Sequence, residues 1–116
     1  MLDHATNMLA FTLIQARPVT DGDPDQHFAD AAKIARNSLE IMASQMASTG
    51  VLHGRDSAIP ELFFHFGAML LGIELLKIFA DWDNDGLPEA DGLSGDTIAK
   101  AAMIVGDRVA RMAMLD

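Results

Sequence analysis

Residues 59–80 read IPELFFHFGAMLLGIELLKIFA and contain the longest apolar stretch of the chain, which covers residues 62–73. Glu61 stands near the start of this stretch, where a carboxylate favours the positive end of a helix dipole. Almost every side of the predicted helix is apolar. Such a helix belongs in the middle of a bundle or at an interface with another copy of the chain. We expect this third helix to be central to the fold.

The same stretch contains polar side chains that disfavour a membrane span. His65 interrupts the apolar run, and Glu74 and Lys77 follow before the run reaches the about 18 residues that a span requires. Ionisable groups at these positions are costly in lipid. We therefore expect a buried helix and no membrane span.

Three further stretches carry apolar residues at the spacing of a helix with one buried stripe. The first runs from Asp3 to about Ala16, and the second starts at Asp23, an N-cap followed by Pro24, and ends near Gly50. The last begins after Gly95. The predicted stripes are Leu2, Ala5, Leu9, Leu13 and Ala16; Phe28, Ala32, Ala35, Leu39, Met42 and Met46; and Ile98, Ala102, Val105, Val109 and Met112.

Length and composition agree with one helical domain. The chain has 116 residues, half of them apolar, which is enough for one hydrophobic core. No segment combines period-two alternation with β-branched enrichment, so no strand is predicted. We expect residues 1–116 to form a single all-α domain, a compact bundle of about four helices without a sheet.

Cysteine is absent, which excludes disulfides, thiolate metal sites and a nucleophilic thiol. The first residues carry an acid, Asp3, where a secretory signal carries basic residues. A cytoplasmic location is therefore expected.

The net charge of −9 argues against direct nucleic-acid binding, because phosphate contacts need clustered Lys and Arg and the eight here are scattered. Acids gather in two clusters, one at residues 21–25 and one at residues 81–91, and the remaining nine nearly balance the eight bases. An acidic inhibitor that mimics nucleic acid is one alternative function for such a chain.

The second acidic cluster has the spacing of a calcium loop. Residues 81–89 read DWDNDGLPE, with carboxylates at the first, third and fifth positions and glycine at the sixth. Acids so spaced can converge on one hard cation when glycine permits a sharp turn, and the seventh residue then supplies its backbone carbonyl. The predicted ligands are Asp81, Asp83, Asp85, Leu87, Glu89 and Asp91.

This stretch resembles the first nine positions of an EF-hand loop and is also similar to the calcium repeats of thrombospondin type 3 domains. It differs at the twelfth position, where both families have an acid and this chain has Gly92, with Asp91 one place earlier. The resemblance covers about a tenth of the chain and implies a calcium site of low affinity. Aspartate, asparagine and glycine are also ordinary turn formers, so an interhelical loop without an ion is the alternative.

Evidence for catalysis is sparse. Glu61 and His65 are four residues apart on one helical face, but no second Glu-x-x-His or His-x-x-x-His pair completes a metal site. The chain has no nucleophile elbow and no phosphate loop. The favoured interpretation is therefore that the protein is not an enzyme. A metal-dependent hydrolase is an alternative function.

The favoured function is protein–protein contact, with the protein itself as the expected partner in a homo-oligomer, and with calcium as a stabilising ion of the 81–91 loop. The chain has eight methionines, several on predicted helices. Such soft side chains either fill the core or line an adaptable groove for a partner.

The calcium hypothesis predicts a response of Trp82, the single tryptophan, which lies inside the loop. Titration with calcium is expected to change Trp82 fluorescence saturably and to raise the melting temperature, because an ion bound to the folded state stabilises it. Asp83→Ala is expected to abolish both effects. No response up to millimolar calcium would leave the loop a simple connector.

Overall fold

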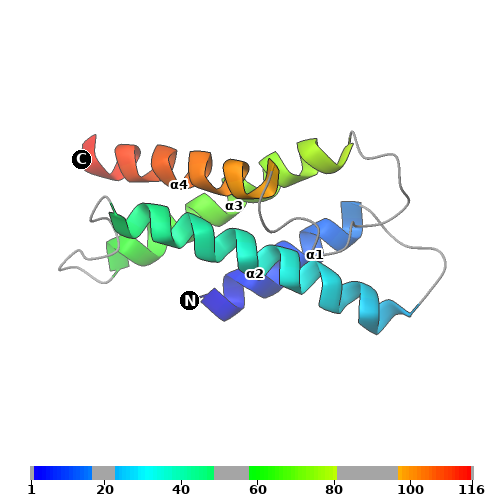
Figure 1. Cartoon of the computed structure of the whole chain (residues 1–116). Coiled ribbons are helices and arrows are strands. Elements are labelled where there is room, and N and C mark those ends of the chain that lie inside the picture. Colours follow the sequence, from blue (N-terminus) through cyan, green and yellow to red (C-terminus); the bar gives the residue numbers. More distant parts are fainter. Residues whose placement is uncertain (1, 17–22, 49–57, 81–96, 116) are drawn as a thin grey trace.

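The computed structural model describes residues 2–16, 23–48, 58–80 and 97–115, and these residues form four helices with no strand among them. The helices are α1 (Leu2–Ala16), α2 (Pro24–Ser48), α3 (Ala58–Ala80) and α4 (Thr97–Leu115). Their bounds lie close to the predicted ones. The expected fold class, an all-α bundle of about four helices, is confirmed (Figure 1).

The start of α2 follows the predicted capping chemistry. The backbone N–H of Asp25 donates to the Asp23 side-chain oxygen at 3.0 Å, and the N–H of His27 donates to the Asp23 carbonyl at 3.0 Å. Pro24, which has no N–H to satisfy, occupies the first helical position. Asp23 is therefore the N-cap, as its place before a proline indicates.

The helices alternate in direction along the chain, so α1 and α3 run one way and α2 and α4 the other (Figure 1). Each helix has two main neighbours. α1 packs on α2 and α3, α4 packs on α2 and α3, α2 touches α3 over a short region, and α1 does not contact α4 in the described part of the chain. As a result, α3 lies beside α1 as a parallel neighbour.

The core lies between these four helices and is filled mainly by aliphatic and aromatic side chains. Ser38 is also buried, and its hydroxyl donates to the Ile34 carbonyl at 2.7 Å, so its burial leaves no unsatisfied group. The largest fully buried side chains are Leu13, Ile34, Leu39, Met42, Met46, Phe64, Leu71, Leu75, Phe79, Val105 and Val109.

Most residues predicted to form the buried apolar stripes are buried or partly buried, but two residues near helix ends are not. Ala16 and Met112 are exposed, because the last turn of a helix can extend past the neighbours that cover its middle. The expected central position of α3 is also wrong. In a bundle of four, every helix occupies a corner, and α3 buries one side while its other side faces outward.

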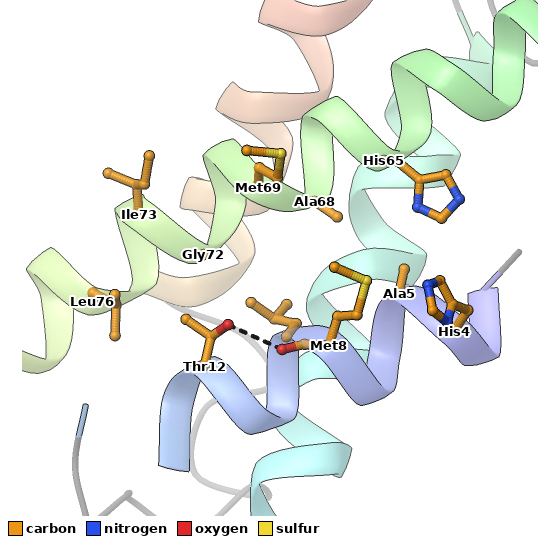
Figure 2. Close-up of a pocket in the computed structure, with 11 residues that line it drawn as sticks. His4, Ala5, Met8, Thr12, His65, Ala68, Met69, Gly72, Ile73 and Leu76 are labelled. Atoms are coloured by element: carbon orange, nitrogen blue, oxygen red, sulfur yellow. Dashed lines mark hydrogen bonds between the residues drawn. The ribbon is translucent and has the colours of Figure 1, made fainter. Parts of the chain in front are cut away.

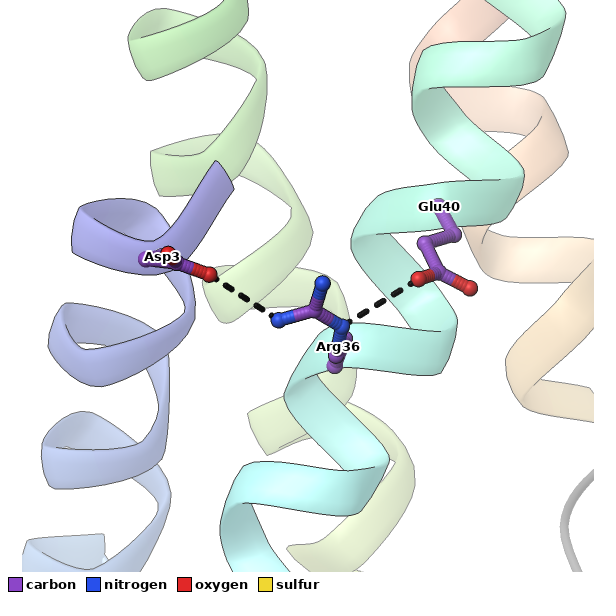
Figure 3. A network of polar contacts seen from close by, with 3 residues as sticks. All are labelled: Asp3, Arg36 and Glu40. Carbon is purple, nitrogen blue, oxygen red and sulfur yellow. Dashed lines mark hydrogen bonds and ion pairs between the residues drawn. The ribbon is translucent and has the colours of Figure 1, made fainter. Parts of the chain in front are cut away.

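An exposed ion-pair network joins α1 to α2 (Figure 3). Arg36 donates from Nη1 to Asp3 at 3.0 Å and from Nε to Glu40 at 3.3 Å. The hydrogen bond to Asp3 is the main reason why the pKa of Arg36 is raised above its usual value. The guanidinium thus stays charged, but solvent screening makes such exposed pairs weak contributors to stability. The network orients α1 on α2 rather than holding the bundle together.

The closest backbone approach between α2 and α4 occurs at Gly106. A Cβ at this position would lie 2.8 Å from the Met42 carbonyl oxygen and 2.8 Å from Gln45 Cβ. These atoms belong to the α2 backbone and to the base of a side chain, so they cannot move aside without shifting the helix. The absence of a side chain at residue 106 therefore permits the observed α2–α4 packing.

Gly106→Ala is expected to destabilise the fold by about 1–2 kcal/mol, because overpacking costs about 1–3 kcal/mol and alanine regains at most about 1 kcal/mol in helix propensity. The measurement is the free energy of unfolding in urea. Gly72→Ala is the matched control, since its Cβ would meet Leu9 Cδ1, the end of a flexible side chain, at 3.2 Å. Equal stability of the two variants would contradict this account of Gly106.

Candidate functional site

The predicted calcium ligands, Asp81, Asp83, Asp85, Leu87, Glu89 and Asp91, lie outside the described residues. Their segment follows the end of α3 at Ala80 and precedes α4, which begins at Thr97. Among the residues that the structure does describe, no three His, Asp or Glu side chains form a group that could hold a metal ion. Calcium binding therefore stays a prediction from the sequence.

The candidate site in the described part of the chain is a groove between α1 and α3, with a volume of about 500 Å³ (Figure 2). This is within the range of sites that bind ligands or partner side chains. We call it the α1–α3 groove. Its lining residues are His4, Ala5, Met8, Leu9 and Thr12 from α1, and His65, Ala68, Met69, Gly72, Ile73 and Leu76 from α3.

Small residues of α3 shape the floor of the groove. Ala68 and Gly72, four residues apart, predict a strip along which another helix can approach closely. The structure places α1 there, since Leu9 Cδ1 lies 3.2 Å from the position of a Cβ at residue 72. Met8 and Met69 stand on the two rims, and more than half of each side chain is exposed. The groove is thus a shallow apolar channel with flexible rims.

One end of the groove is polar (Figure 2). The rings of His4 and His65 meet edge to face with centroids 5.8 Å apart, and His65 Nε2 lies 3.7 Å from Glu61 Oε1. The Glu61–His65 proximity follows from their spacing on one helix. The sequence does not predict the contact between His4 and His65, because it joins the N-terminal parts of α1 and α3, two helices that only the tertiary fold places side by side.

The rest of the groove offers little chemistry. The Thr12 hydroxyl donates to the Met8 carbonyl of its own helix at 3.0 Å. No carboxylate is among the described lining residues, and His4 and His65 are the titratable ones. Acid–base or metal-assisted hydrolysis needs convergent groups in defined roles. The groove is therefore better suited to binding an apolar surface than to a reaction.

The outward side of α3 continues the apolar surface beyond the groove. Leu62 and Met69 are about two-thirds exposed, at 67% and 65% of their surfaces, and Phe66 and Ile73 lie on the same side with 38% and 51% exposed. We call these four residues the outer stripe. The opposite side of α3 buries Phe64, Leu71, Leu75 and Phe79 in the core. α3 is therefore apolar on both its buried and its exposed side.

The methionines divide between the two roles that the sequence allows. Met42 and Met46 are fully buried and fill the core. Met8, Met69 and Met103 are at least half exposed, and the first two line the groove. Sequence position alone does not separate these two sets, because burial depends on which helices become neighbours.

Of the eight acids in the two clusters, the structure describes Asp23 and Asp25, which lie exposed at the start of α2. The acidic-mimic alternative requires both clusters on one surface, and most of them lie outside the described residues. On α4, Arg111 Nε lies 2.9 Å from Asp107 Oδ2, an ion pair between residues four apart on one helical face.

Comparison of the chain with models of known protein families, with curated proteins and with solved structures finds no match. The class that the fold and the groove define is an acidic all-α four-helix domain with an apolar face formed by α1 and α3.

Proposed function

We propose that this protein is a small acidic interaction module that self-associates through the outer stripe and the adjoining α1–α3 groove. The observation that supports the proposal is that Leu62, Phe66, Met69 and Ile73 form one continuous apolar side on a helix whose opposite side is already in the core. Contiguous exposed apolar surface of this kind is typical of protein interfaces.

The size of the exposed side chains supports burial against a partner. Full burial of a large apolar side chain contributes roughly 1.5–3 kcal/mol relative to full exposure. Leu62 and Met69 still expose most of their surface, so much of this free energy is available to an association. A second copy presents the same apolar side, whereas a soluble partner of another kind would need its own matching surface.

A membrane is the competing occupant of this surface. The part of α3 from Glu61 to Ala80 is long and apolar enough to cross a bilayer by length and composition. However, Gly67 packs closely against Met42 and Val109, and Gly72 against Leu9, so α3 is held by all three other helices. Glu74 and Lys77 add charge to the same segment. These contacts favour a water-soluble bundle that uses α3 as an interface.

The other sequence-based alternatives have weaker support. Among the described residues, no observation favours an acidic mimic of nucleic acid or a metal-dependent hydrolase over self-association. In this proposal, calcium would stabilise the 81–91 loop. Self-association through α3 would not depend on that ion.

Sedimentation equilibrium tests the proposal. The wild-type protein is expected to show a mass that increases with concentration between about 1 and 100 µM, the range of a moderately weak complex. Met69→Lys is expected to raise the dissociation constant at least about tenfold, because a charge in an apolar interface must be desolvated. Its helical circular dichroism is expected to match the wild type, since Met69 is exposed in the single copy.

Asn37→Lys is the matched control, because it adds the same charge at an exposed position of α2 and is expected to leave the mass unchanged. A wild-type protein that stays monomeric over the whole concentration range would refute self-association. Binding of that monomer to neutral phosphatidylcholine vesicles, lost in Met69→Lys, would instead assign the apolar face to a membrane surface.

A further inference from the structure

We infer that two copies of this protein pair about a two-fold axis with their α3 helices antiparallel, so that Leu62 of each copy packs on Ile73 of the other and Phe66 on Met69. This inference rests on the proposed self-association and specifies its geometry. It follows from two properties of α3, which are the spacing of its outer stripe and the position of its charges.

The outer stripe is symmetric about its own midpoint. Its residues follow one another at intervals of four, three and four, so the stripe reads the same from either end. In a two-fold interface, residue i contacts residue j and residue j contacts residue i. An antiparallel pair centred between Phe66 and Met69 meets this condition and covers all four exposed side chains at once.

A parallel pair would cover the same four side chains, so the charges decide between the two arrangements. Glu61 lies at the N-terminal end of the stripe and is 58% exposed, with His65 as its neighbour at 3.7 Å. Lys77 lies beyond the C-terminal end of the stripe and is 68% exposed, 3.4 Å from Glu74. The charge pattern of the interface thus differs between its two ends.

In a parallel pair, both Glu61 carboxylates would lie at one end of the interface and both Lys77 ammonium groups at the other. Like charges placed across an interface disfavour the arrangement that brings them together. In the antiparallel pair, the Glu61 end of each copy lies beside the Lys77 end of the other.

The antiparallel pair also closes the α1–α3 groove. Met69 belongs both to the outer stripe and to the groove lining, and Met8 forms the opposite rim. A second α3 seated on the outer stripe therefore approaches the mouth of the groove of the first copy. The groove is open in the single copy, and the second copy completes it as an enclosed apolar space.

The absence of cysteine makes this geometry directly testable by disulfide cross-linking. The variants are Leu62→Cys and Ile73→Cys, at the two ends of the outer stripe, each oxidised alone and as an equimolar mixture. In the antiparallel pair, Leu62 of one copy lies roughly 16 Å along the helix axis from Leu62 of the other copy, because eleven residues separate positions 62 and 73 and each residue rises about 1.5 Å. A disulfide needs Cα atoms within about 7 Å.

The mixture is therefore expected to give at least about tenfold more disulfide-linked dimer than either variant alone, because it alone brings two thiols into range. Asn37→Cys, on the exposed side of α2, is the control for random collision and is expected to give none. Sedimentation of each variant under reducing conditions, beside the wild type, verifies that the substitution leaves self-association intact.

Efficient cross-linking of Leu62→Cys alone and of Ile73→Cys alone would show a parallel pair, which overturns this inference and leaves self-association standing. No cross-link in any sample, with a wild-type dimer in sedimentation, would place the interface away from the outer stripe and also overturn it. A monomeric wild type would refute the proposed function itself, and with it the antiparallel pair.

Discussion

The limited number of neighbours that α3 can have within one chain is the constraint on which the rest of this structure depends. A helix at the corner of a four-helix bundle buries the side that faces its neighbours and leaves the other side to solvent. Because α3 is apolar all round, this arrangement leaves Leu62 and Met69 exposed while Phe64 and Leu71 fill the core. The shape of the bundle therefore produces the apolar face to which we assign the function.

Small residues decide which helices come together. Gly106 lets the backbones of α2 and α4 approach, and Gly72 receives Leu9 of α1. The larger side chains then fill the space between these close contacts. The α1–α3 groove arises in the same way, because Ala68 and Gly72 provide a floor of small residues while Met8 and Met69 form its rims. The contacts that hold the bundle together therefore also define its candidate site.

Charge contributes more to specificity than to the stability of this fold. The ion pairs on the described helices are exposed, and such pairs add little to stability. Their positions still matter, because Arg36 joins the first turn of α1 to α2 and because Glu61 and Lys77 mark opposite ends of the outer stripe. Apolar packing thus determines that the helices associate, and charges select among the arrangements that packing allows.

Local patterns in the sequence determined the helices. Apolar spacing, the Asp23 N-cap and the breakers between segments predict the bounds of all four within a few residues, because capping and periodicity act over one or two turns. The sequence also marked α3 as apolar on every side and placed Glu61 beside His65. These features depend on neighbours along the chain, so one sequence is sufficient to recognise them.

The tertiary structure alone decided which of these helices are neighbours. It moved α3 from the expected centre to a corner, brought His4 to His65, and divided buried Met42 and Met46 from exposed Met8 and Met69. Such contacts join residues that are far apart in the sequence, and a helical period shows that a side is apolar without showing what covers it. The fold class was therefore determined by the sequence itself, whereas the candidate interface was decided by packing.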